Sequence, residues 1–185
     1  MPAIRLLTIV VACTLITACA RPAAQSTPVE RGKYLVTIGG CNDCHTTKKM
    51  GPNGPEPDTT KLLAGHPEDM KMPAPPSLPP NGPWAIVVAP TLTAWSGPWG
   101  TSFAANLTPD ANTGLGNWTE DMFVKAMRTG KHMGVSRPIL PPMPVQELKM
   151  MSDEDLKAVF AYLKSVPPVV NHVPDPVPPA AASGT

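Results

Sequence analysis

Five consecutive residues, Cys41-Asn42-Asp43-Cys44-His45, carry the most specific chemistry in this chain of 185 residues. Two cysteine thiols separated by two residues can each add across a vinyl group of haem, and the histidine that follows can then bind the iron. This spacing is typical of c-type haem attachment. A thioredoxin-like redox pair and half of a zinc site are the alternatives, but the sequence has neither a surrounding βαβ pattern nor a second CxxC. We therefore expect one covalently bound haem c.

The second axial ligand of the iron decides what such a haem does. A methionine thioether would complete a low-spin iron suited to electron transfer, whereas an open position would permit gas binding or peroxide chemistry. Met143 leads the candidates because Pro142 and Pro144 keep its backbone out of a helix and direct its side chain. The other candidates lie in less constrained loops, at a helix start, or are histidines of unassigned role: Met70, Met72, Met133, Met150, Met151, His66, His132 and His172. The residues alone leave this choice open.

Composition places these motifs in one domain with extensions. The chain has 26 prolines and only 5% aromatic residues, so long irregular segments are expected around a cofactor that helps to fill the core. A formal net charge of +1 gives no argument for a nucleic-acid partner. The single CxxCH limits the chain to one haem.

The N-terminal segment is typical of a bacterial export signal. The apolar stretch Leu6–Ile16 is too short to cross a bilayer, which takes about 20 helical residues, but it suits a secretory signal. It ends in Ile16-Thr17-Ala18-Cys19, which resembles a lipobox with Cys19 as the lipidated residue. Cleavage of an ordinary signal peptide near Ala18 or Ala24, with no role for Cys19, is the alternative. Because Ala20 is not aspartate, resemblance to bacterial lipoproteins weakly favours the outer membrane.

Three helices are expected to surround the motif. The first spans 29–40, with Tyr34, Leu35 and Ile38 at helical spacing. The second follows Thr119 as N-cap, and the third follows Ser152 as N-cap.

The segment 58–100 is broken by prolines, and we expect it to fold over one side of the haem with a short strand at 85–88, paired with 91–95. A backbone carbonyl in the loop 48–57 is expected to accept a hydrogen bond from His45, which would orient its ring. The proline-rich tail after Pro167 is expected to be extended along the surface.

Several further motifs carry a resemblance to a known family. They are Asn106-Leu107-Thr108-Pro109-Asp110, Thr113 to Thr119, Arg128-Thr129-Gly130-Lys131-His132, Leu140-Pro141-Pro142-Met143-Pro144, and Asp153 to Leu156 leading to Ala161 to Ser165. Together they resemble a branch of the class I c-type cytochromes, namely the haem modules in cytochrome subunits of membrane-bound alcohol, aldehyde and gluconate dehydrogenases. The resemblance covers 29–168.

That resemblance implies an all-α class I cytochrome c fold with a long Pro-rich loop insertion. It also implies that Met143 is the distal ligand, and that the first and last helices cross with Gly32 or Tyr34 near Leu156 and Phe160. The family's subunits commonly hold three such modules, whereas this chain holds one.

These observations lead to one prediction for the whole chain. Residues 1–18 are a lipoprotein signal peptide, 19–28 a linker after the lipidated Cys19, 29–168 a cytochrome c domain, and 169–185 a Pro-rich tail. The domain binds one haem c through Cys41 and Cys44, with His45 and Met143 on the iron.

The chain is predicted to be an electron carrier, not an enzyme. It would be lipid-anchored on the periplasmic side of a membrane, and would pass single electrons between a dehydrogenase and a terminal oxidase or another cytochrome. A haem enzyme or sensor with an open sixth position is the alternative. A subunit that is stable only within a dehydrogenase complex is a third possibility.

Overall fold

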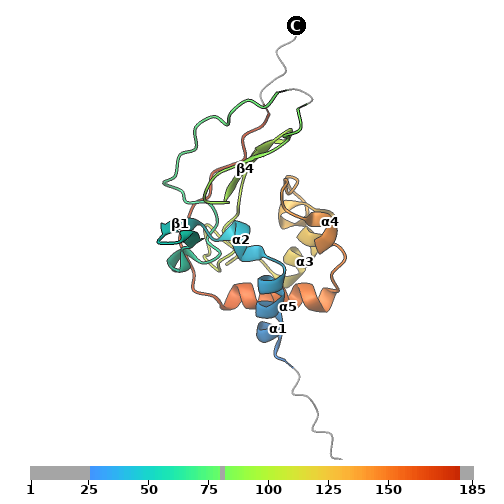
Figure 1. Cartoon of the computed structure of the whole chain (residues 1–185). Helices are drawn as coiled ribbons and strands as arrows, with labels where there is room; N and C mark the ends of the chain where they lie inside the picture. Colours follow the sequence, from blue (N-terminus) through green and yellow to red (C-terminus); the bar gives the residue numbers. More distant parts are fainter. Residues whose placement is uncertain (1–25, 80–81, 180–185) are drawn as a thin grey trace, which may run out of the picture.

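The computed structural model describes residues 26–79 and 82–179, so the predicted signal peptide, Cys13 and Cys19 lie outside the described residues. The α-helices are α1 (Pro28–Ile38), α2 (Cys41–His45), α3 (Glu120–Thr129), α4 (Val145–Leu148) and α5 (Asp153–Ser165). Two short 3-10 turns are η1 (Thr59–Lys61) and η2 (His132–Gly134). The strands are β1 (Lys48–Gly51), β2 (Gly54–Pro57), β3 (Val87–Val88), β4 (Ala94–Gly97) and β5 (Gly100–Phe103). Figure 1 shows α5 running across the lower part of the molecule, with α1 crossing it, α2, α3 and α4 above it, and the strands farther up.

The prediction of an all-α fold is wrong, because the described part of the chain is mixed and contains two small antiparallel sheets. One is the hairpin β1–β2, and the other has the strand order β3–β4–β5. Both hairpins close through glycine pairs, Gly51 with Gly54 and Gly97 with Gly100, at tight turns that a helical pattern does not use. The expected strand at 85–88 is present as the shorter β3, whose Val87 pairs with Ser96.

Helices α1 and α5 approach closely through a single glycine. Gly32 is buried, and a Cβ atom at this position would lie 1.9 Å from the carbonyl oxygen of Ala158 in α5. Only a residue without a side chain allows the two backbones to come this near. The expected crossing at Gly32 is therefore present, but its contact is with Ala158, while Tyr34 is 54% exposed.

Local sequence explains where the two long helices of the second half begin. The Thr119 hydroxyl accepts a hydrogen bond from the amide of Met122 at the start of α3, and Ser152 does the same for Asp155 in α5. These side chains satisfy amides that have no partner inside the helix. The predicted N-caps are confirmed, and α3 ends at Gly130, whose φ of 68° is left-handed.

The core lies between α1, α3 and α5. Its fully buried side chains include Val36, Leu156 and Leu163, and the rings of Phe123 and Phe160 pack with centroids 5.2 Å apart. Ile38, expected on the apolar face of the first helix, is 61% exposed, because α1 turns its Gly32 and Val36 side toward α5. Within residues 26–79 and 82–179, no helix combines the length and the apolar character that a membrane span needs.

Candidate haem-binding site

Helix α2 places both thiols of the CxxCH motif on one short element. Gly39 and Gly40 end α1 and let the chain reverse into α2, since Gly40 has a left-handed φ of 65°. Cys41 and Cys44 are three residues apart on this helix and therefore share a face. Neither is in a disulfide, and Cys41 packs against the hydrophobic core.

His45 is oriented for ligation by one of its two ring nitrogens. The side chain is buried, and Nδ1 lies 2.8 Å from the carbonyl oxygen of Ala105. Nδ1 therefore carries the proton and donates it to that oxygen, which leaves Nε2 as the nitrogen with a free lone pair. Burial lowers the pKa of His45, with the Ala105 bond acting in the opposite direction, and the neutral ring is the form that binds a metal.

The acceptor of this hydrogen bond differs from the expectation. The loop after His45 was predicted to supply it, but 48–57 forms the hairpin β1–β2, whose carbonyls pair across the two strands. Ala105, sixty residues after His45, supplies the carbonyl instead. A hydrogen bond of this kind fixes the ring and raises the basicity of the metal-binding nitrogen.

The competing interpretations of the CxxC pair fit this geometry less well. Burial raises the pKa of Cys41 and of Cys44, with Asp43 adding a smaller effect in the same direction, whereas a redox-active CxxC needs a lowered thiol pKa. Within the described residues, no three His, Cys, Asp or Glu side chains gather closely enough to hold a metal ion. The chain itself thus builds no zinc site around Cys41 in the part that the structure describes.

A buried hydroxyl next to the motif also fits a polar cofactor edge. Thr47 Oγ1 is buried and has no hydrogen-bond partner among the described residues, and it is the one such side-chain atom found in them. Buried polar groups are nearly always paired, so an orphan in a native fold calls for a partner. The residues around α2 therefore fit a haem: two thiols on one face, an imidazole with a free Nε2, and a spare hydroxyl.

The loop that carries Met143 is held from both ends. On its N-terminal side, Ser102 Oγ in β5 donates to the carbonyl of Pro141 at 2.5 Å, and the Pro141–Pro142 peptide is cis. On its C-terminal side, Arg128 donates from its guanidinium to the carbonyls of Lys149 and Met151, at 2.6 and 2.7 Å. Met143 itself is half-buried between these anchors, where α4 packs on α3.

The segments that carry the two predicted axial ligands, His45 and Met143, are both connected to helix α5 by packing. Helix α2, with His45, packs on α1, and α4, which follows Met143, packs on α3. Both α1 and α3 pack on α5. Figure 1 shows α2 and α4 on either side of the central region above α5. The fold thus presents the segments of both predicted ligands from separate elements of one helical core.

The structure narrows the list of other candidate ligands. His66 is fully buried, and both of its ring nitrogens are engaged in hydrogen bonds. Nδ1 is hydrogen-bonded to Thr93 Oγ1 at 2.9 Å, and Nε2 to the carbonyl of Met70 at 3.0 Å. Both ring nitrogens are therefore already used. Met150 is 86% exposed, and Met151 packs against the hydrophobic core, as expected for a residue at a helix start.

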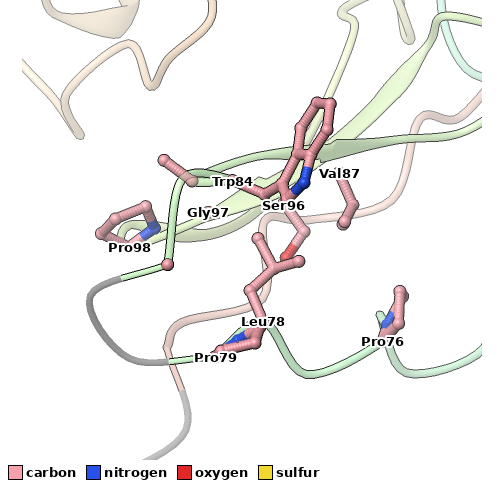
Figure 2. A pocket seen from close by; sticks show the side chains of 10 residues that line it. Pro76, Leu78, Pro79, Trp84, Val87, Ser96, Gly97 and Pro98 are labelled. Carbon is pink, nitrogen blue, oxygen red and sulfur yellow. The ribbon is translucent and has the colours of Figure 1, made fainter.

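A separate groove lies in the Pro-rich insertion and contains none of the predicted haem residues. It has a volume of about 340 Å³ and includes Leu78, Trp84 and Val87 in its lining. Figure 2 shows Leu78 below Trp84, a residue that is 72% exposed. The groove is thus a feature of the insertion and not of the CxxCH site.

Two residues that position the site, Ala105 and Ser102, were not predicted from the sequence. Ala105 supplies only a backbone carbonyl, which leaves no mark in a side-chain pattern. Ser102 is an ordinary strand serine. Asn106 is part of a motif that carries the family resemblance, and its side chain donates a hydrogen bond to the carbonyl of Val169 in the Pro-rich tail.

Known proteins that are similar to this chain indicate the class of protein to which it is related. No family model matches the chain. The cytochrome c subunit of the quinone-type alcohol dehydrogenase of Gluconobacter oxydans is 38% identical over 155 residues, which are 82% of this chain and 25% of that subunit. The gluconate 2-dehydrogenase cytochrome c subunit of Pantoea cypripedii is 31% identical over 153 residues, 82% of this chain and 26% of that protein. The fructose dehydrogenase cytochrome subunit of Gluconobacter japonicus is 29% identical over 143 residues, which are 77% of this chain and 22% of that subunit.

The chain is therefore related to c-type cytochromes. More particularly, it is similar to cytochrome subunits of gluconate, fructose and alcohol dehydrogenases, and the resemblance inferred from the motifs is confirmed. By their printed names these relatives are the cytochrome subunits of dehydrogenases. The chain spans about a quarter of the length of each of them.

Proposed function

We propose that this chain is a monohaem c-type cytochrome that passes single electrons between a periplasmic or membrane dehydrogenase and a terminal oxidase or another cytochrome. The observation that carries the proposal is His45, buried directly after the two thiols of α2, with Nδ1 bonded to Ala105 and Nε2 free. The similarity to dehydrogenase cytochrome subunits supports the same function.

Each residue of the site has one role in this proposal. The sulfur atoms of Cys41 and Cys44 would hold the haem through its two vinyl positions, and His45 would bind the iron through Nε2. Met143 would supply its thioether as the second ligand of the iron. When bound, the haem supplies an iron that gains and loses one electron. With both axial positions filled, the protein's task is to set the potential and to keep the ligands in place.

The test of this function is the haem content and ligand reactivity of the purified chain, expressed in a host that attaches haem c. We expect one haem per chain that stays with the polypeptide under denaturing conditions, and a reduced form that does not bind carbon monoxide. Replacing both Cys41 and Cys44 by alanine should abolish covalent attachment. Absence of covalent haem in the unaltered chain would refute the proposal, and carbon monoxide binding to the reduced protein would support the open-site alternative.

We also propose that the chain is exported and anchored by lipid on Cys19, at residues outside the described part of the structure. The apolar stretch before Cys19 supports export, and its last residues support lipidation. Cys19→Ala should stop the incorporation of labelled fatty acid and release the cytochrome from the membrane fraction. Cys13→Ala is the matched control, since Cys13 lies within the same apolar stretch but not at its end. Membrane retention of Cys19→Ala without loss of label would contradict the anchor.

The partner is inferred only from the relatives, each of which is about four times as long as the region that matches this chain. We infer a dehydrogenase as the electron donor, with the haem domain at 29–168 as the docking module. A dehydrogenase that co-purifies with the chain from solubilised membranes, and that reduces its haem when given substrate, would identify the partner. Slow reduction by every dehydrogenase of the native membrane would argue against this assignment.

A further inference from the structure

The C-terminal segment after α5 is bound to the body of the protein and is not a loose tail. It runs back past the sheet β3–β4–β5, and Val177 pairs with Thr101 through two backbone hydrogen bonds of 2.8 and 2.9 Å. Figure 1 shows this segment rising from α5 along the strands. We call residues 169–177 the strap. Its tightest attachment is at Asn171, which is only 8% exposed.

The side chain of Asn171 ties the strap to the loop that follows η1. Its Nδ2 donates to the carbonyls of Ala64 and His66, at 2.6 and 2.9 Å. Its Oδ1 accepts from the amide of Glu68 at 2.9 Å. Both donors and the acceptor of the amide are therefore used inside the protein, which is the pattern of a residue that holds distant segments together.

Asn106 makes the reciprocal attachment from the segment that follows β5. Its Nδ2 donates to the carbonyl of Val169 at 2.8 Å and to Thr113 Oγ1 at 3.1 Å. Its Oδ1 accepts from the amide of Thr108 at 3.0 Å. At 4% exposure this amide is buried, and it depends on the strap for its best-placed acceptor.

Ala105 lies between two residues that are fixed in this way. Its neighbour Ala104 donates to the carbonyl of Thr93 and accepts from the amide of His66. The other neighbour is Asn106. Gly65, with a φ of 80°, packs so closely that a Cβ there would lie 2.7 Å from the Ala105 oxygen, and the Gly65 amide donates to the carbonyl of His45.

We propose that the strap is a positioning element for the proximal ligand, with Asn171 and Asn106 as positioning residues that hold the Ala105 carbonyl against His45 Nδ1. This rests on the proposed function, in which His45 binds the haem iron through Nε2. The side-chain hydrogen bonds of both asparagines go to residues other than Ala105 and α2. They act through the loop 64–68 and through Ala105, which the strap keeps in register with α2.

The physical consequence is a change in the electron affinity of the iron. A strong bond from Nδ1–H to a carbonyl makes the imidazole a better electron donor, which stabilises the oxidised iron. Outer hydrogen bonds of this kind are one way in which a protein sets a haem potential. When the strap is released, Ala105 moves away from Nδ1, and the reduced state is favoured.

The test is the midpoint potential of the full-length holoprotein with Asn171→Ala. We expect a shift to higher potential in which the ratio of reduced to oxidised protein rises about tenfold at a fixed applied potential, or roughly 59 mV for one electron. The His45 Nδ1 proton, followed by NMR, should exchange with solvent at least about tenfold faster. The absorption spectrum should keep both axial ligands.

Two controls separate positioning from a general loss of stability. His172→Ala changes the exposed neighbour in the strap while its backbone bond to Glu68 remains, and it should leave the potential unchanged. Ser152→Ala removes the N-cap of α5 and weakens the fold away from the strap, and it should also leave the potential unchanged. An unchanged or lowered potential in Asn171→Ala, or an equal shift in Ser152→Ala, would overturn the proposal.

A measurement on the unaltered protein covers the case in which Asn171→Ala does not fold. Two protons that become exposed to solvent in the same local opening are protected from exchange to the same degree. The His45 Nδ1 proton and the Asn171 side-chain amide protons should therefore share one protection factor. A far longer-lived Nδ1 proton would show that the strap opens without releasing Ala105, and would overturn the proposal. If the unaltered protein lacks covalent haem or a histidine ligand, the proposed function fails instead, and its spectrum shows this before any variant is made.

Discussion

Replacing Gly32 by alanine is expected to lower the free energy of unfolding by about 3 kcal/mol, the upper part of the usual range for overpacking. The added Cβ would lie 1.9 Å from the Ala158 carbonyl oxygen and 2.8 Å from the Cβ of Tyr162. The first contact is with backbone, so α1 must move away from α5. Alanine favours helix by about 1 kcal/mol over glycine, and this gain is too small to compensate.

Denaturant unfolding of the holoprotein, followed by far-ultraviolet circular dichroism, measures this effect. Lys33→Ala is the matched control, since Lys33 is the exposed neighbour on α1, and its change should stay within about 0.5 kcal/mol. Equal stability of Gly32→Ala and the unaltered protein would contradict the close crossing of α1 and α5. The same displacement should disturb α2, because α2 packs on α1.

Replacing Met143 by alanine is expected to remove the distal iron ligand. The oxidised protein should lose its weak sulfur-to-iron charge-transfer band, and the reduced protein should gain carbon monoxide binding. The midpoint potential should fall by on the order of 0.1 V or more, within the roughly 0.8 V that axial ligands span. Thioether ligation raises the potential, so its loss acts in this direction.

Met150→Ala is the matched control for this change. Met150 lies shortly after α4 in the same region, and it is 86% exposed, so its removal should alter neither the band nor the potential. Persistence of the sulfur-to-iron band in Met143→Ala would exclude Met143 as the ligand. A high-spin spectrum already present in the unaltered protein would do so as well.

The sequence predicted the helical part of the fold because its signals are local. Thr119 and Ser152 each cap a helix whose apolar positions follow at once, and the structure places α3 and α5 there. The close helix contact at Gly32 was also predictable, because a glycine inside a helix lowers its stability and is expected where another segment must approach closely. Tyr34 was misjudged because its spacing suits either face of a short helix, and packing against α5 decides between them.

The hairpin β1–β2 and the strand β5 were not predicted, because prolines and short lengths conceal the pattern of a strand. The hairpin β1–β2 contains Pro52, Pro55 and Pro57, which break the alternating pattern used to recognise strands, and its pairing depends on Gly51 and Gly54 at the turn. Likewise β4 and β5 are only four residues each. The prediction included a strand at 85–88 paired with 91–95, which corresponds to β3 and β4, but it treated 48–57 as a loop and assigned no strand at 100–103.

The candidate site likewise has residues that local sequence predicts and residues that it does not. Cys41, Cys44 and His45 are contiguous, so their chemistry is visible in one line of sequence. The partner of His45 is a backbone carbonyl sixty residues later, and the strap that steadies it comes from beyond α5. Such contacts depend on tertiary folding alone, and no local sequence pattern around Ala105 or Asn171 predicts them. The role of Met143 stays a prediction, supported by the anchoring of its loop at Ser102 and Arg128.

The most direct test of the account is the near-infrared magnetic circular dichroism of the oxidised, full-length protein, which reports the pair of axial ligands on a low-spin haem. The account predicts a single low-spin species with a histidine–methionine signature, from one haem per chain. A histidine–histidine signature, or a high-spin spectrum with water or no ligand opposite His45, would contradict it.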